Sequence, residues 1–317
     1  MILTNHTHNI SLDFDLGNVQ NHENMAVVPV ITNKNPKLDL LTLKKGLELD
    51  LVEVKELDES TVNTISVKND AVTPLIIFNG EEIIGSKQNR IINNTMVLAP
   101  KSINHVEVSC TEQGRWEHIT PTFKQSEYMA NFKTRQKKEV TLRKYDNCQS
   151  EVWNSISSLE CDHSFSSPTK AMSESYDNLK ANHDEFLNAF SIEKNQIGVV
   201  VILDGEIKGF ELFYSHPIYK EYHEKILRSY LIDNENKNPV FTVNTAEVEA
   251  LLLQAMDSSF SEKESKSLEN ILEFENDYGI GTLYAYENEV VHWSFFKKQE
   301  LKDEEEVLID DMEDITV

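Results

Sequence analysis

The sequence predicts an α+β protein with a β-rich N-terminal lobe, a helical connector and a smaller α+β C-terminal lobe. Alternating and β-branched apolar stretches, typical of short strands, dominate the chain up to residue 122. Beyond it, Ser, Asn, Lys and Glu dominate, and apolar residues recur at helical spacing. The strand pattern returns with the run IGVVVIL. We therefore expect four parts: residues 1–122, 123–195, 196–300 and an acidic flexible tail over 301–317.

Strand-like stretches fill the first lobe, at residues 25–32, 51–57, 62–67, 94–98 and 105–110. Leucines at helical spacing predict one short helix over 39–49. Asn79-Gly80 stands between the apolar runs PLIIF and EEII. Asn-Gly is the strongest short hairpin signal, because a type I′ turn needs positive φ at both central residues. We therefore expect a β-hairpin at this point.

Four helices are expected after residue 122, two in the connector and two in the second lobe. Their apolar spacing covers residues 151–159, 173–190, 216–230 and 245–256. Pro217 suits the first turn of the third helix, and Thr245 suits the N-cap of the fourth. Further hairpin turns are expected at Asp204-Gly205 and around Glu287-Asn288.

Two segments, IIFNGEEIIG and VVILDGEIKG, share an apolar strand, an Asn-Gly or Asp-Gly turn, a Glu and a later Gly. An internal duplication explains the likeness, and so does convergence of two hairpins on the same turn chemistry. The sequence leaves both explanations open.

The overall charge and the cysteine content exclude several classes of protein. A formal charge of −24 disfavours non-specific binding to nucleic acid or to an anionic membrane, because both need a cationic surface. No apolar run approaches the roughly 18 residues of a membrane span, and the N-terminus lacks a signal-peptide pattern. Cys110, Cys148 and Cys161 are an odd number without zinc-like spacing. We therefore expect a cytoplasmic protein without a disulfide framework.

The charge is distributed unevenly along the chain. Residues 124–144 hold seven cations against two carboxylates, whereas the segment after Lys302 holds eight carboxylates and no cation. The two segments could pair with each other, or each could meet a protein partner. A solvated surface helix followed by a frayed tail explains the same pattern.

Glycine and arginine are scarce, with 10 Gly in 317 residues and 5 Arg against 25 Lys. Residues used this sparingly mark positions that need backbone freedom or a guanidinium fork. Several of them fall within residues 80–116, namely Gly80, Gly85, Gly114, Arg90 and Arg115. This window therefore holds the candidate functional residues.

Three familiar kinds of site fit the window poorly. Gly80 and Gly85 have the spacing of a phosphate loop, but the next two residues are Ser-Lys instead of Lys-Ser, and a strand follows where a helix should begin. Cys110 and Arg115 are separated by four residues instead of the five of a cysteine phosphatase, and strand parity points Cys110 into the core. The candidate metal ligands share no fixed spacing, so no metal is expected: Glu81, Glu82, Glu112 and His105.

A polar ligand site fits the window better. Planar, multi-donor side chains suit phosphate, ribose or base edges, and an arginine beside a tryptophan offers a platform for a nucleobase. The candidate ligand-binding residues are Lys87, Gln88, Asn89, Arg90, Glu112, Arg115 and Trp116.

Glu81 and Glu82 are the candidates for a general acid or base. They alternate sides of a strand, so we expect one of them to line a cleft and the other to be structural. A surface network that pairs Glu81 or Glu112 with Arg90 or Arg115 explains the same residues equally well.

The order of GEE, GSKQNR and C-T-E-x-G-R-W resembles a domain family named for its association with ADP-ribosylglycohydrolases and rhodanese-phosphatases. The resemblance covers residues 25–120 and continues more loosely through LDGEIKGFELF and VVHWSFF. Family members usually have Ala where this chain has Ser86, and the basic block and the acidic tail lie outside the resemblance. The resemblance implies a setting in the turnover of NAD-derived nucleotides or ADP-ribose conjugates, and it carries over no established activity.

We therefore expect the first lobe to bind an ADP-ribose-like or other NAD-derived phosphorylated nucleoside. Arg90 and Arg115 would hold phosphates, Gln88 and Asn89 would hold ribose or base, and Trp116 would stack. If the protein is an enzyme, hydrolysis or phosphoryl removal is the favoured reaction, and the sequence identifies no cofactor. The alternative is a non-catalytic adaptor or recognition module for ADP-ribose-processing enzymes.

Overall fold

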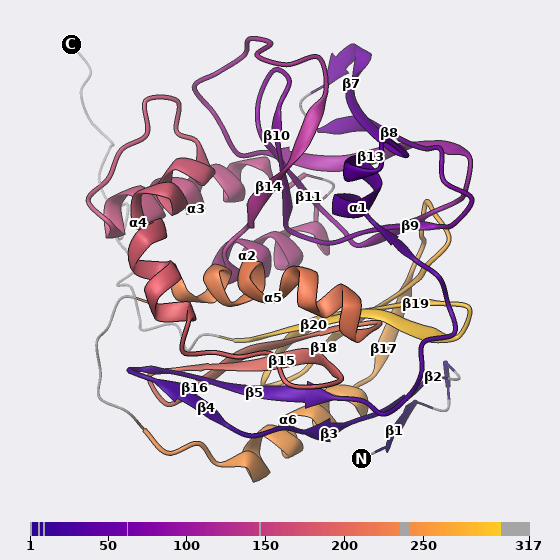
Figure 1. Ribbon diagram of the computed structural model, residues 1–317, viewed down its shortest axis with the longest axis vertical. Helices are drawn as coiled ribbons and strands as arrows, with labels where there is room; N and C mark the ends of the chain where they lie inside the picture. Colours follow the sequence, from indigo (N-terminus) through magenta and orange to yellow (C-terminus); the bar gives the residue numbers. More distant parts are fainter. Residues whose placement is uncertain are drawn as a thin grey trace, which may run out of the picture.

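The computed structural model describes residues 2–5, 7–8, 10–61, 63–145, 147–234 and 241–298. Within these residues the α+β class is confirmed, with mostly antiparallel sheets and helices packed in layers (Figure 1). The acidic tail expected over 301–317 lies outside the described residues.

The largest layer is an antiparallel sheet that joins both ends of the chain. Val199 and Val201 pack in the cluster that includes α5 (His216–Leu231), whereas Val200 and Ile202 pack in the cluster that includes α6 (Thr245–Met256). Because side chains alternate along a strand, α5 and α6 cover opposite faces (Figure 1). The strands in spatial order are β17 (Phe260–Lys263), β18 (Asn270–Glu275), β19 (Gly279–Tyr286), β20 (Glu289–Lys297), β16 (Glu206–Phe213), β15 (Gln196–Leu203), β5 (Met25–Ile31) and β3 (Asp15–Leu16), with β4 (Gln20–His22) also paired to β5.

Two further sheets and a hairpin complete the strands of the described residues. The six-stranded sheet runs β14 (Phe123–Met129), β10 (Glu81–Gly85), β11 (Arg90–Ile92), β13 (Ser102–Cys110), β8 (Thr64–Asn69) and β7 (Val52–Thr61). The three-stranded sheet runs β12 (Met96–Leu98), β9 (Leu75–Ile77) and β6 (Leu41–Thr42), and β1 (Ile2–Asn5) pairs with β2 (Ile10–Asp13). The edge strands β14 and β7 of the six-stranded sheet approach each other, so this sheet curls around an apolar core that it shares with the three-stranded sheet.

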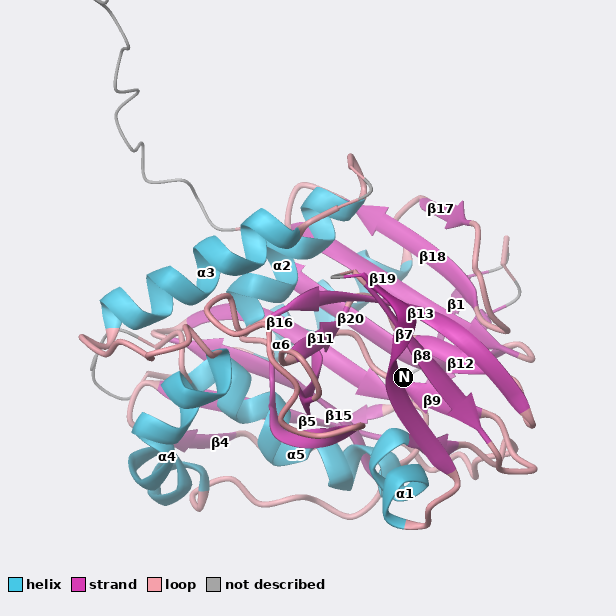
Figure 2. Cartoon of the chain, turned by 90° about the horizontal axis from the view of Figure 1, so that it is seen from above, coloured by secondary structure: helices cyan, strands magenta, loops and turns pink. Residues whose placement is uncertain are grey.

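The connector holds the expected helices, α3 (Gln149–Asp162) and α4 (Met172–Leu187), preceded by α2 (Phe132–Leu142). Figure 2 shows α2 and α3 side by side. The first residues of the connector depart from the expectation of a purely helical segment, since they form β14 and pair with β10. The run FKQSEYM hides this strand because only part of it alternates between buried and exposed positions.

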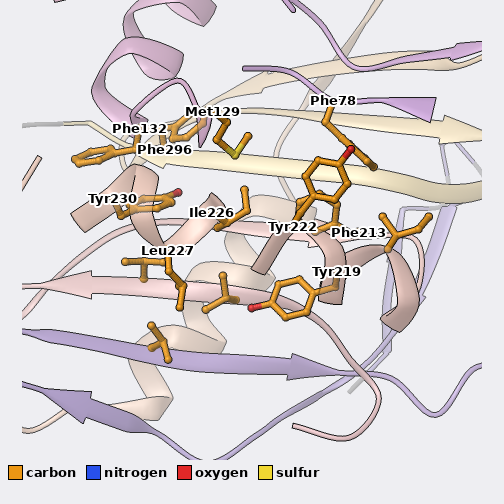
Figure 3. Packing of buried hydrophobic residues seen from close by; sticks show 14 of the residues in the cluster. Phe78, Met129, Phe132, Phe213, Tyr219, Tyr222, Ile226, Leu227, Tyr230 and Phe296 are labelled. Carbon is orange, nitrogen blue, oxygen red and sulfur yellow. The ribbon is translucent and has the colours of Figure 1, made fainter. Parts of the chain in front are cut away.

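Helix α5 lies between the nine-stranded sheet and the six-stranded sheet (Figure 1). Its Tyr222 and Ile226 pack with Phe78, which follows β9, and with Met129 of β14 (Figure 3). The N-terminal and C-terminal segments therefore share one core through α5. The boundaries expected at residues 122, 195 and 300 stay a prediction, although the pairing of β5 with β15 ties residues 25–31 to the C-terminal sheet.

The expected hairpin at Asn79-Gly80 is wrong. Strands β9 and β10 do not pair, because β9 lies between β12 and β6 whereas β10 lies between β11 and β14. Only Gly80 has positive φ, at 82°, and the Glu81 N–H donates to the Phe78 carbonyl at 3.1 Å, as in a type II turn. The turn therefore carries the chain from one sheet to the next.

The other two turns are confirmed as hairpins. Asp204-Gly205 joins β15 to β16, Glu287-Asn288 joins β19 to β20, and all four residues have positive φ. The two similar segments therefore fold differently, one as a crossing between sheets and one as a hairpin.

Two local expectations need small corrections. Asn244, one residue before Thr245, caps α6 by accepting from the Ala246 N–H at 3.1 Å. The short helix α1 covers only Leu43–Glu48, because Thr42 supplies its N-cap.

The basic block is not a uniformly solvated surface. Arg135 is buried and pairs with Glu211, and Lys138 is buried and donates to the backbone carbonyls of Ile92 and Asn93 at 3.0 and 2.6 Å. Burial lowers the pKa of Lys138 to about 7. These cations hold the interior together, so the expectation of a charged outer face is wrong for them.

Candidate functional site

A groove of about 990 Å³ opens where the edge strands β14 and β7 of the six-stranded sheet approach each other. Residues of α1 and α5 also line it. A concave site bordered by several elements is where ligands bind most often. The groove is therefore the candidate site, and its charges and buried carboxylates decide what it can do.

Three groove lysines come from three different elements: Lys44 from α1, Lys124 from β14 and Lys220 from α5. All three are exposed, and their side chains make no ion pair or hydrogen bond with any residue that the structure describes. Other cations of the groove are already paired; Lys180, for example, lies 3.1 Å from Glu127. The three lysines are therefore available for an anionic ligand.

Glu81 lies behind the groove at an irregularity in β14. Glu81 pairs with Met129 but Ile83 pairs with Gln125, so residues 126–128 of β14 stand opposite Glu82 alone. Such bulges are common next to active sites. The buried Glu81 carboxylate accepts from Gln125, from the Tyr222 hydroxyl at 2.8 Å and from the Phe78 N–H at 3.2 Å. Its hydrogen bonds join the groove to α5.

Glu82 is fully buried and only partly satisfied. Its Oε1 accepts from the Thr111 hydroxyl at 3.0 Å, whereas its Oε2 has no hydrogen-bond partner among the described residues. Burial raises the pKa of Glu82 to about 7, against the opposing effects of Ser126, Thr111 and the charge of Lys225. A carboxyl group with this pKa holds or releases a proton near neutral pH, as general acid–base catalysis requires.

Lys225 connects the two carboxylates to the groove that it lines. Its Nζ donates to the Ser126 carbonyl in the irregular part of β14 at 2.6 Å. Burial lowers the pKa of Lys225, although the negative charges of Glu81 and Glu82 favour its charged form. Burial also raises the pKa of Glu221, a further groove carboxyl. Several titratable groups with shifted pKa values therefore converge at this wall, which is typical of functional sites.

The predicted ligand residues around Arg115 form a closed network instead of an open site. The Arg115 Nε and Nη2 donate to the two oxygens of Glu112 at 2.8 and 2.5 Å. Its Nη1 donates to the carbonyls of Ser86 and Glu117, both at 2.8 Å. Glu112 also accepts from the Asn89 N–H at 3.2 Å. The guanidinium is saturated, as the ion-pair interpretation of these residues expects.

Gln88 and Arg90 are buried behind Trp116. The Arg90 Nη1 donates to Gln88 Oε1 at 2.9 Å, and the Gln88 Nε2 donates to the Glu112 carbonyl at 2.9 Å. The Lys87 Nζ lies 5.1 Å from the centre of the Trp116 ring, and the Arg90 guanidinium carbon lies 5.8 Å from it. Arg90 and Arg115 both donate to Asn89, so the two side chains lie close together. Neither presents guanidinium N–H groups to solvent that are free to bind a phosphate.

The rejected alternatives find no support in the geometry. The Gly80 N–H donates to the Ile92 carbonyl and the Gly85 N–H to Asn89 Oδ1, so these amides are not free to cradle a phosphate. Cys110 is buried, and burial raises the pKa of its thiol, which disfavours a nucleophile. No group of three or more His, Cys, Asp or Glu within the described residues is placed to hold a metal ion.

Sequence reasoning named Glu81 and Glu82 but missed the groove itself. Both glutamates are fully buried, and neither is among the residues that line the groove, where one of them was expected to line a cleft. Lys44 and Lys220 were hidden because their helices carry ordinary surface lysines, and Lys225 because it lies within a helix whose residues are mostly buried. Lys124 stood in the basic block but was not distinguished from the cations that turn inward. No single-sequence signal marks a lysine that lacks a partner, since this depends on three elements meeting.

The chain matches a known domain family over most of its length. The model of the ARG and Rhodanese-Phosphatase-superfamily-associated Protein domain matches residues 13–296. The chain therefore belongs to this family, and the match includes every candidate site residue. No curated protein and no solved structure gives a significant match. Among the described residues, no helix is long and apolar enough to cross a membrane.

Proposed function

We propose that the groove binds an ADP-ribose-like, NAD-derived phosphorylated nucleoside and processes it by hydrolysis or phosphoryl removal. The observation that carries this proposal is the buried Glu82 carboxyl, with a pKa of about 7. It lies beside Ser126 and Lys225 of a groove in which three lysines have no partner among the described residues. The family name supports the setting, since it associates the domain with ARG proteins and the rhodanese-phosphatase superfamily.

Each group has a distinct task in this proposal. Lys44, Lys124 and Lys220 hold the phosphates as point charges from three sides. Glu82 donates or accepts the proton, and Lys225 tunes its charge. Glu81 is the structural member of the pair, because its carboxylate already accepts three hydrogen bonds.

Most of the predicted ligand residues in the 80–116 window hold the backbone in place instead of contacting the ligand. Asn89, Glu112 and Arg115 fix the backbone around Gly85, next to the strand that carries Glu82. Lys87 and Trp116 remain candidates for direct contact with the ligand, since Trp116 is half exposed.

The experiment is a binding and turnover assay with ADP-ribose and its phosphorylated derivatives. Changing Lys44, Lys124 and Lys220 together to Gln should weaken binding at least about 100-fold, because each lost charge–phosphate contact costs about 1–2 kcal/mol. The matched control changes Lys34, Lys37 and Lys298 to Gln, three lysines in ion pairs elsewhere, and should leave affinity unchanged. Equal affinity of the two triple variants would remove the groove from the proposal.

A non-catalytic recognition module is the second candidate, favoured by the saturated pair of Arg115 and Glu112. It binds the same ligand without converting it, and it engages partner proteins through exposed cations of the basic block, such as Lys137 and Lys144, or through the acidic tail. Glu82→Gln separates the candidates: it abolishes turnover in an enzyme that the wild type shows to be active, whereas a recognition module shows binding and no turnover in either form.

The three cysteines are free thiols, which supports the cytoplasm as the proposed compartment.

A further inference from the structure

A buried pair of opposite charges that no hydrogen bond joins lies outside the residues that line the groove, with its arginine beneath Trp116. Arg90 of β11 and Glu56 of β7 face each other with 3.7 Å between Nη2 and Oε1. Both side chains are at least nine-tenths buried, at 0% and 6% exposed. That distance is too long for a hydrogen bond, so the pair is held close without being joined.

The Arg90 nitrogens that make no hydrogen bond with a described residue form one edge of its guanidinium. Nη1 is engaged by Gln88 and Asn89, which fixes the orientation of the group. Nε and Nη2 are buried and have no hydrogen-bond partner among the described residues, and the same holds for both oxygens of Glu56. The Nε–Nη2 edge is the one that binds two acceptor atoms side by side. A buried polar group without a partner is costly, so these atoms point to a ligand or to bound water.

The charges decide which ligand suits the pair. An anion would be attracted by Arg90 but repelled by the Glu56 carboxylate. A cation would be attracted by Glu56 but repelled by Arg90. A hydroxyl satisfies both, because its oxygen accepts from the guanidinium while its hydrogen is donated to the carboxylate. Two neighbouring hydroxyls match the two donors of Arg90 and the two acceptors of Glu56.

We propose that Arg90 and Glu56 form a covered binding site for a vicinal diol, such as the 2′,3′-hydroxyls of a ribose. Trp116 is its cover. The ring lies over Arg90 at 5.8 Å, is 50% exposed, and stands in a loop outside the strands and helices. Rotation of Trp116 uncovers the pair, and its freed ring face packs against the sugar or the base that the sugar carries.

This assignment replaces the expected phosphate contact of Arg90 with a hydroxyl contact. It rests on the proposed function only for the nucleoside class of the ligand, since the groove lysines are not needed for a nucleoside without phosphate. Adenosine therefore tests the diol site alone, and ADP-ribose tests the groove.

The decisive experiment compares adenosine with 2′,3′-dideoxyadenosine by titration calorimetry, using the whole chain. Adenosine should bind at least about tenfold more tightly, because the dideoxy compound leaves Arg90 and Glu56 unpaired. Its binding should change the fluorescence of Trp116, and Trp116→Phe should remove that signal. Equal affinity for the two nucleosides, or no binding of adenosine at about 10 mM, would overturn the proposal.

Two glutamate variants test whether adenosine binds at the pair of Arg90 and Glu56. Glu56→Gln keeps the shape but removes the charge, and should weaken adenosine binding about tenfold. Glu107→Gln, the same change at a half-exposed glutamate paired with Lys266, should leave it unchanged. Similar affinities of the two variants would contradict the assignment. The comparison of nucleosides needs no variant, so it decides the matter even if Glu56→Gln does not fold.

The experiments can overturn the proposed function of the groove and the diol site independently of each other. If the groove lysine variant loses ADP-ribose but keeps adenosine, both stand. If adenosine binds and ADP-ribose does not depend on the groove lysines, the proposed function falls and the diol site remains. If the dideoxy compound binds as well as adenosine while the lysine variant loses ADP-ribose, the diol site falls and the groove remains.

Discussion

The groove wall and the Arg115 network contain the same kinds of residue in opposite states. Arg115 and Glu112 meet through two short hydrogen bonds, and the remaining donors of Arg115 reach backbone carbonyls. At the groove wall, Glu82 keeps one oxygen without a hydrogen bond, and Lys124 keeps its whole ammonium free among the described residues. Saturated charges hold a structure together, whereas unsaturated charges near a groove remain available for a ligand. Hydrogen-bond saturation, and not residue type, separates the two regions.

The largest effect is expected from breaking the saturated network. Glu112→Ala leaves the Arg115 Nε, the Asn89 N–H and the Thr169 hydroxyl without their acceptor. The free energy of unfolding should fall by about 3 kcal/mol, because one partner of a nearly buried ion pair is lost. Urea denaturation measures this, with the exposed Glu117→Ala as the control. A loss below about 1 kcal/mol would show that the network contributes no more to stability than an ordinary surface ion pair.

The same comparison predicts how Glu82 links stability to pH. Its folded pKa, about 7, lies above the ordinary glutamate value of 4.5, so between these pH values the folded state holds a proton that the unfolded state has released. The free energy of unfolding therefore falls as pH rises through this window, by up to about 3 kcal/mol. Glu82→Gln cannot ionise, and its stability curve should lack this fall.

The measurement is the free energy of unfolding of wild type and Glu82→Gln at several pH values from 4.5 to 8. The difference between the two curves isolates Glu82 from the other titrating groups. Parallel curves would mean that Glu82 ionises normally, and its task as a proton donor would have to be abandoned.

The fold was predictable where local chemistry dominates. The turns Asp204-Gly205 and Glu287-Asn288 have positive φ at both positions, and the sequence alone indicates this. Asn79-Gly80 is the stronger hairpin signal by sequence but forms a type II turn, because the Gly80 N–H donates to the Ile92 carbonyl and the chain passes into another sheet. Gly80 is required there by its positive φ and by Arg135, whose side chain lies where a Cβ would be. Long-range pairing of this kind leaves no local trace.

The site was predictable in its carboxylates and not in its cations. Rarity drew attention to Arg90 and Arg115, but rare arginines serve structural forks as well as ligands, and Arg115 is one of the former. Arg115→Lys is therefore expected to weaken the fold itself, although the sequence analysis expected Arg115 to hold a phosphate. The free lysines of the groove were indistinguishable in a chain with 25 of them.

Cys110 provides a smaller test of which thiols are structural. It is buried and accepts from the Glu112 N–H at 3.4 Å, beside the saturated network. Cys110→Ala should lower the free energy of unfolding by about 1–2 kcal/mol and leave ligand binding unchanged, because packing and one weak hydrogen bond are lost. In the native wild type, the exposed Cys161 should react with a thiol reagent long before Cys110 does. Fast labelling of Cys110 would reopen a nucleophilic task for it.

The smallest effect on stability is expected at the groove lysines, and this is the sharpest contrast with Glu112. Lys124→Gln and Lys220→Gln each remove a charge that has no partner among the described residues, so no hydrogen bond or ion pair is lost. The free energy of unfolding should change by less than about 0.5 kcal/mol, and it should rise where nearby lysines repel one another. A destabilisation above about 1 kcal/mol in either variant would mean that these lysines are structural, and the distinction between the two regions would fail.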